Sequence, residues 1–231
     1  MTGSITIDVL AIIALCFTIY LAKRNIVVNH YKNRIYILLS VITIALLLLE
    51  IATVLMAQSN SSDLVIPHRI INILGFSLSP LFPFLFLFFY NTREKVKYRH
   101  NYLTIPLYIN ALICILSYHT GWVFFVDGQN QYYRGDFFLL PTLVGLFYFV
   151  LIIAEARNTA AWKMEQRKYL ILALFIPILG VLLQILYSHI LIIWGCVAIY
   201  LVLFYILLRE LQYKYDVQTG IQNRTAFQHE M

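Results

Sequence analysis

The chain has 231 residues, of which 61% are hydrophobic and only 12% charged, and its formal net charge is +6. Soluble domains carry about 25% charged residues, so this composition excludes a water-soluble globule of this size. The surplus of lysine and arginine falls in a few short connecting segments, so it indicates membrane topology and predicts no nucleic-acid partner.

Apolar segments long enough to cross a bilayer recur along the chain. About 20 apolar residues, rising 1.5 Å each, span a hydrocarbon core about 30 Å thick. Only Ser188 and His189 interrupt the last two segments, but one helix over both would be about twice as long as a membrane is thick. The sequence therefore predicts an all-α fold, a bundle of seven transmembrane helices, with six as the alternative. The predicted helices cover residues 5–22, 35–56, 70–90, 102–118, 137–154, 169–187 and 190–208.

The distribution of basic residues predicts the orientation. All but two of the 17 lysines and arginines follow the first, third or fifth predicted helix, or lie beyond residue 208. The two exceptions are Arg69 and Arg134. Short loops rich in lysine and arginine stay in the cytoplasm, so we expect the N-terminus outside and the C-terminus inside. The first segment has no cleavage pattern behind it, so we interpret it as an anchor and not as a signal peptide.

Residues 119–136, between the fourth and fifth predicted helices, have the pattern of a β-hairpin. Aromatic and β-branched residues at 122–126 and 131–134 flank turn-forming residues at 127–130, and Asp127-Gly128 is the pair expected to take positive φ angles. We therefore predict a small extracellular hairpin. It forms either an ordered lid over the bundle or a membrane-surface loop anchored by its aromatic side chains.

Proline occurs inside the third to sixth predicted helices. Each proline removes a backbone donor and can kink its helix, which suits either packing or gating. The positions are Pro80, Pro83, Pro106, Pro141 and Pro177.

Strongly polar residues within the predicted spans are few and mostly lie in their outer halves. Glu50 lies roughly 9 Å below the outer end of its helix. Polar groups in lipid are unfavourable unless they face the bundle or a wet cavity, so we expect an outward-opening pocket around Glu50. The alternative is that Glu50 stays protonated or hydrogen-bonds to a neighbouring helix. The predicted ligand-binding residues are Glu50, Asn72, Asn110, Thr142, Gln184, His68, His119 and His189.

The three histidines in this set are all predicted at the outer boundary. Imidazole binds metals and titrates near neutrality. The spacing of His68, His119 and His189 does not match a metal-binding motif, so we expect surface histidines and no metal site. The three cysteines fall in different predicted helices and are expected to be packing residues without disulfides.

The sequence contains no catalytic motif. Catalysis by intramembrane carboxylates would need at least two of them, and we expect only Glu50 to be buried. We therefore predict that the chain is not an enzyme, has no catalytic residue and carries no cofactor of its own.

The segment after the last predicted helix is the most distinctive part of the sequence. Residues 209–215 are predicted to form a cytoplasmic linker helix with heptad-like apolar spacing, and the predicted signal-transmitting residues are Leu208, Leu211, Tyr215 and Asp216. Residues 216–227 resemble the opening of GGDEF-type diguanylate cyclase domains, which read Asp-x-Leu-Thr-Gly-Leu-x-Asn-Arg-Arg-x-Phe. Gln218 and Thr225 depart from that pattern. The matching residues are Asp216, Thr219, Gly220, Asn223, Arg224 and Phe227.

The resemblance implies three parts: a seven-helix sensor domain at 1–208, the linker at 209–215 and the beginning of a GGDEF domain at 216–231. The family's active-site signature would lie beyond Met231, so Mg²⁺ and GTP are expected only for that missing cyclase domain. Residues 1–208 also resemble the bacterial seven-helix sensor domain at the N-terminus of some histidine kinases and cyclases. That likeness lies in the hairpin residues 132–135 and in Pro80 followed by a phenylalanine-rich run to Tyr90.

These features predict a signal-input module of the bacterial inner membrane. It would sit in the lipid bilayer as a multi-pass protein and bind a small-molecule or lipid ligand in its outer half. It would regulate a cytoplasmic cyclase as a homodimer through the linker and output domain. The alternatives are a small-solute transporter, which also needs an intramembrane carboxylate and broken helices, and a passive anchor. The apolar inner half argues against a transport path.

Overall fold

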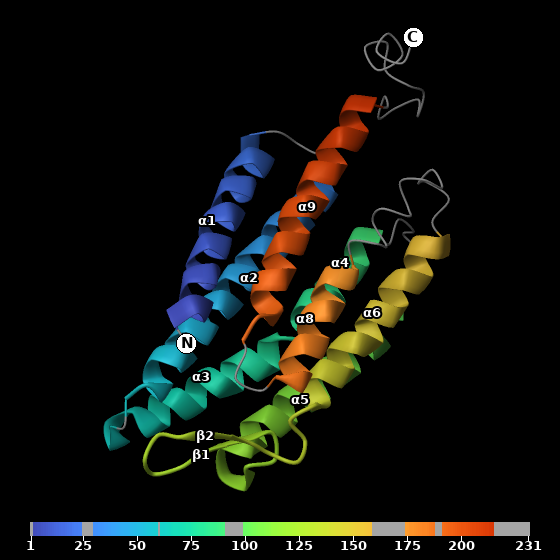
Figure 1. Ribbon diagram of the computed structural model, residues 1–231. Coiled ribbons are helices and arrows are strands. Elements are labelled where there is room, and N and C mark those ends of the chain that lie inside the picture. The colour runs from blue at the N-terminus through green and yellow to red at the C-terminus, as the bar shows by residue number, and fades with distance from the viewer. Residues whose placement is uncertain are drawn as a thin grey trace.

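The computed structural model describes residues 2–24, 30–59, 61–90, 99–158, 174–187 and 191–214. This part of the chain is mostly helical, with one two-stranded antiparallel sheet at one end of the bundle and the C-terminal end of the last helix at the other (Figure 1). The mostly helical fold and the hairpin are therefore confirmed. The helices are α1 (Thr2–Arg24), α2 (His30–Ala57), the short 3₁₀-helix η1 (Ser62–Leu64), α3 (Val65–Leu78), α4 (Leu81–Tyr90), α5 (Arg99–Thr120), α6 (Leu140–Asn158), α8 (Phe175–Leu186) and α9 (Ile193–Lys214).

Several of these helices have the length and composition of membrane spans. Within the described residues, five helical segments are long and apolar enough to cross a membrane, and two shorter apolar helices accompany them. The helices also expose apolar side chains: Leu10 and Phe17 of α1 and Tyr108 of α5 are 60 to 72% exposed. A soluble protein rarely exposes such continuous apolar surface, whereas a bundle surrounded by lipid needs it. The long segments are Ser4–Arg24, His30–Ala57, Ser62–Phe89, Tyr102–Thr120 and Ile193–Glu210, and the shorter ones are Leu140–Glu155 and Phe175–Leu186.

The predicted helix at 70–90 is in fact two helices, α3 and α4, with a turn at Ser79 and Pro80 between them. Proline cannot donate to the carbonyl four residues earlier, which here is that of Phe76, and its ring clashes with it. The freed Phe76 oxygen accepts hydrogen bonds from Ser79 Oγ at 3.1 Å and from Asn110 Nδ2 of α5 at 3.0 Å. The break is therefore satisfied by side chains inside the bundle, as an interrupted membrane helix requires.

Three of the other predicted prolines differ from the prediction of internal kinks. Pro83, Pro141 and Pro177 each lie in the first turn of a helix, where the missing N–H has no intrahelical partner to lose. Pro106 lies inside α5, as predicted. Prolines in this chain thus mainly mark where helices begin.

The core is centred on α9, which packs against α1, α2 and α8 and touches α4 through aromatic rings. Phe204 of α9 meets Phe86 and Phe89 of α4 edge-on, with ring centroids 5.1 and 4.9 Å apart. Tyr36 of α2 lies 5.4 Å from the Tyr205 ring and donates to the carbonyl of Leu201. Large side chains therefore fill the part of the bundle where α9 meets α2 and α4, away from the hairpin.

The hairpin pairs β1 (Phe124–Val126) with β2 (Tyr132–Arg134). The predicted turn position is wrong in one respect: the positive φ angle, 63°, belongs to Asn130 and not to Asp127-Gly128. Asp127 Oδ1 accepts from the backbone N–H groups of Gln129 and Gln131, which fixes a three-residue loop ending in a left-handed residue. Such a loop is a common alternative to the two-residue turn.

Candidate functional site

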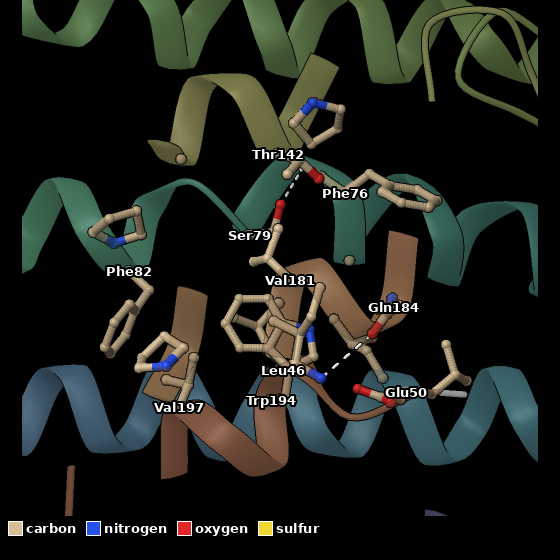
Figure 2. A pocket seen from close by; sticks show the side chains of 18 of the residues that line it. Leu46, Glu50, Phe76, Ser79, Phe82, Thr142, Val181, Gln184, Trp194 and Val197 are labelled. Atoms are coloured by element: carbon tan, nitrogen blue, oxygen red, sulfur yellow. Dashed lines mark hydrogen bonds between the residues drawn. The ribbon is translucent and has the colours of Figure 1, made fainter. Parts of the chain in front are cut away.

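A cavity of about 180 Å³ lies inside the bundle, in the half nearer the hairpin. Its wall is built from α2, α3, α4, α6, α8 and α9, and Figure 2 shows the side chains that face it. The structure places four of the eight predicted ligand-binding residues in this wall. They are Glu50, Asn72, Thr142 and Gln184.

The cavity wall is polar toward the hairpin and apolar at depth. Glu50 and Thr53 lie near the end of α2, and Gln184 near the end of α8, which are the ends of those helices closest to the hairpin. Figure 2 shows Glu50 and Gln184 near one another, with Phe82 and Val197 on the other side of the view. A ligand with one polar and one apolar end would therefore have a fixed direction in this cavity.

Most polar side chains of the wall already have backbone partners. Asn72 Nδ2 donates to the carbonyl of His68, and Thr53 Oγ1 donates to that of Leu49. Gln184 Oε1 accepts from the backbone N–H groups of Ile192 and Ile193 at 3.3 Å each, and so caps the start of α9. These residues shape the wall and hold the helix ends that form it.

Glu50 is different, because its buried Oε1 has no hydrogen-bond partner among the described residues. The alternative reading, in which Glu50 hydrogen-bonds to a neighbouring helix, finds no contact for this oxygen in that part of the chain. A buried polar atom without a partner is unfavourable unless something else occupies the space beside it. Glu50 is therefore the side chain of the wall best placed to meet a ligand.

A second buried carboxyl corrects the expectation that Glu50 would be alone. Asp8 of α1 is only 1% exposed, its Oδ2 has no hydrogen-bond partner within the described segments, and it interacts electrostatically with Glu50. Asp8 lies behind the cavity wall, not on it. The sequence analysis did not single out Asp8, which lies in the first turn of the predicted helix at 5–22.

Asn110, another predicted ligand-binding residue, does not reach the cavity. It is fully buried, and its amide satisfies the Phe76 carbonyl at the break between α3 and α4. Its role in the structure is to join α5 to that break.

The three histidines do not gather at one site. His68 is fully buried, against the prediction of a surface position, whereas His119 is exposed at the end of α5 and His189 lies outside the described residues. His68 Nδ1 lies 2.8 Å from Asn130 Oδ1. Because that oxygen can only accept, Nδ1 carries the hydrogen.

Asn130 joins the hairpin to the helices beside the cavity. Its side chain is fully buried, and Nδ2 donates to the carbonyls of Met56 and Ser59 at 2.7 and 2.8 Å. Together with the bond to His68, these contacts tie the hairpin loop to the end of α2 and the start of α3. We call this set of three bonds the Asn130 latch.

The two arginines predicted on the outer side also hold the hairpin. Arg69 Nη2 donates to the carbonyl of Val126 at 2.6 Å, and Arg134 Nη2 donates to that of Gln184 at 3.2 Å. Burial raises the pKa of Tyr132, although the charge of Arg134 acts in the opposite direction, so this phenol keeps its proton. The hairpin is therefore a docked lid, although Trp122 and Tyr133 remain about half exposed.

Helix α9 connects the cavity to the opposite end of the bundle. Trp194 and Val197 line the cavity, and the same uninterrupted helix reaches Leu208, which is buried, and ends at Lys214. The predicted linker residue Leu211 thus lies in α9. Tyr215, Asp216 and the rest of the GGDEF-like motif lie outside the described residues.

No group of three histidine, cysteine, aspartate or glutamate side chains in the described segments could hold a metal ion. The cysteines are unpaired: Cys114 is buried, Cys196 is half-buried and Cys16 is exposed on α1. Exposure of Cys16 on an apolar helix differs from the predicted packing role.

Comparison with known protein families, curated proteins and solved structures finds no match for this chain. The fold itself is a bundle of long apolar helices with an internal cavity in the half nearer the hairpin.

Proposed function

We propose that this chain is the signal-input module of a membrane-bound diguanylate cyclase. In this proposal seven helices cross the bacterial inner membrane, with the N-terminus and the hairpin outside and the C-terminus in the cytoplasm. An external or membrane-borne small ligand binds in the cavity beneath the hairpin. The cavity with its unpartnered Glu50 is the observation that carries the proposal.

The orientation is supported by where the charges lie. Lys23 and Arg24 occupy the last turn of α1, and that end of α1 lies away from the hairpin, on the same side as the end of α9 (Figure 1). Arg209 lies near that end of α9. A cytoplasmic position for this end follows from the tendency of basic segments to remain inside.

Helix α9 offers a route from ligand to output. Over the stretch from Trp194 to Leu208 a helix rises about 21 Å, at 1.5 Å per residue. Closely packed aromatic cores resist gradual deformation, so displacement at one end of α9 would move the helix as a body. The ligand has this effect only if it binds two helix arrangements with different affinity.

The same core disfavours transport. Phe82, Phe86 and Phe89 of α4, with Tyr200 and Phe204 of α9, fill the bundle beyond the deep end of the cavity. A transporter needs a polar path to both faces. A passive anchor, by contrast, has no need of a cavity with a buried carboxyl.

The test joins the chain, through residues 216–231, to a complete GGDEF domain and measures cyclic-di-GMP in cells. Glu50→Gln should change the output or its response to stimuli, whereas Asp63→Asn, which alters an exposed acid near the hairpin, should not. Inserting three residues after Gln212 turns the helix by about 300° and should change the output.

Inserting seven residues adds about two full turns and restores the original face, so this variant should signal more normally than the three-residue insertion. If the output ignores both Glu50→Gln and the three-residue insertion, the module is a passive anchor. Flux of small solutes into proteoliposomes that survives deletion of residues 209–231 would favour a transporter.

A further inference from the structure

The cavity wall contains an acidic side chain, and none of the described residues that line it is basic. No lysine, arginine or histidine is among the described residues that line it, whereas Glu50 contributes a carboxyl with a free buried oxygen. Asn72, Thr53, Ser79 and Gln184 of the wall have backbone partners, and among the described lining residues only Glu50 has a buried side-chain atom that lacks one. The polar group that awaits a partner is therefore acidic.

Asp8 strengthens this imbalance. It is almost completely buried on α1, interacts with the Glu50 carboxyl, and also leaves one oxygen without a partner in the described part of the chain. Two neighbouring carboxyls in a medium of low dielectric constant either bind a proton or, if both are charged, need a cation beside them. The pair thus favours a positively charged group on the cavity side of Glu50.

The rest of the wall suits the apolar part of such a ligand. Aromatic rings contribute much of the surface of the cavity wall. The face of an aromatic ring attracts an ammonium group and also packs against another ring. A cavity of about 150 Å³ holds benzene, so the roughly 180 Å³ here fits a ligand with about one ring and no lipid chain or peptide. The aromatic residues of the wall are Phe76, Phe82, Phe138, Phe149 and Trp194.

We propose that the cavity binds a small organic cation, an ammonium compound of about one ring, whose ammonium group pairs with Glu50 in front of Asp8. Its apolar part points away from the hairpin toward Phe82 and Val197. This inference rests on the proposed function, because it names the class of ligand that the sensing cavity binds. Binding itself is measured without any output domain.

The experiment uses the full chain in lipid nanodiscs and three probes that share a ring: benzylammonium, benzyl alcohol and benzoate. Fluorescence of Trp194 reports occupancy once Trp122→Phe and Trp162→Phe remove the other two tryptophans. Benzylammonium should give a saturable change, with benzyl alcohol and benzoate each binding at least about tenfold more weakly. No saturable response to benzylammonium, or equal binding of benzyl alcohol, overturns the proposal.

Variants then locate the charge. Glu50→Gln should weaken benzylammonium about tenfold or more and leave benzyl alcohol unchanged, and Asp8→Asn should have a smaller effect because Asp8 lies behind the wall. Asp63→Asn is the matched control and should bind as the parent does. Unchanged benzylammonium affinity in Glu50→Gln refutes the pairing.

A second variant keeps the test decisive if Glu50→Gln fails to fold. Gly75 lies on the cavity wall, and a Cβ added there meets nothing within 4 Å, so Gly75→Leu fills the space while both carboxyls remain. It should abolish benzylammonium binding, and retained binding places the site elsewhere. Selective benzylammonium binding without any effect of Glu50→Gln on cyclic-di-GMP would support this inference while the signalling proposal fails.

Discussion

The two halves of the bundle are held together by different interactions. Near the hairpin, hydrogen bonds and a small apolar cluster around Phe124 join the lid to the helices, and a cavity lies in this half. In the other half, aromatic rings of α2, α4 and α9 fill the interior. The difference teaches that a half with a cavity depends more on the contacts at its rim, because it has less packing than a filled core.

The largest effect should come from opening the filled half. Phe86 is fully buried among Phe82, Phe89, Tyr200 and Phe204, so Phe86→Ala should lower the free energy of unfolding by about 3–5 kcal/mol. Packing contributes most of the stability between membrane helices, so the lost contacts are not replaced by lipid. Unfolding of the purified protein in mixed micelles would measure it.

The matched control for that change is Phe17→Ala, which removes the same side chain from a position on α1 that is 60% exposed. We expect a change below about 1 kcal/mol there. Equal losses of unfolding free energy in the two variants would mean that aromatic packing in this half does not contribute more to stability than contacts on the bundle surface.

The next largest effect should come from breaking the rim. Asn130→Ala removes all three bonds of the Asn130 latch and leaves His68 Nδ1 and two carbonyls without their partner, a loss of about 2–3 kcal/mol. The effect should be local. Hydrogen exchange at the amides of β1 and β2 should accelerate, while that of α9 should stay slow.

Asn130→Gly separates the contribution of the Asn130 side-chain hydrogen bonds from that of its positive φ angle. Glycine takes the positive φ angle easily, so this variant loses only the side-chain bonds, and Asn130→Ala should be less stable than Asn130→Gly by roughly 1 kcal/mol. The interpretation of the latch fails if hairpin exchange is unchanged in both variants.

Four polar residues of the cavity wall could be predicted because depth along a helix can be counted from the sequence. Glu50, Thr142 and Gln184 each lie in the half of their helix nearer the hairpin. Residues at the same depth on neighbouring helices lie close together, so these three meet at one cavity. The same counting could have found Asp8, six residues into α1, because Glu50 lies seven residues before the end of α2 and the two helices run antiparallel.

The contacts of His68 and Asn110 could not be predicted in the same way. His68 is buried because Asn130 reaches it across 62 positions of the chain, which depends on how the hairpin docks. Asn110 is occupied because Pro80 breaks a helix on a different segment and frees a carbonyl beside it. Both are consequences of tertiary packing, and a pattern of polarity along one helix does not contain them.

The smallest effects we predict come from two glycine-to-alanine substitutions, one on the cavity wall and one at a close contact between two helices. At Gly75, on the hollow side, an added Cβ meets nothing within 4 Å, so Gly75→Ala should raise the free energy of unfolding by about 0.5–1 kcal/mol through lower flexibility of the unfolded chain. At Gly180 of α8 the same Cβ lies 3.0 Å from Cβ and Sγ of Cys196 on α9, so Gly180→Ala should lower it by about 1 kcal/mol or more.

Opposite signs for these two variants, measured in the same micelle unfolding assay, would show that α8 and α9 are in close contact while the adjoining wall has room to spare. Small residues at helix contacts allow this approach in membranes. If both variants were stabilised, α8 would stand further from α9 than the structure places it, and the Gln184 cap that positions the start of α9 would lose its basis.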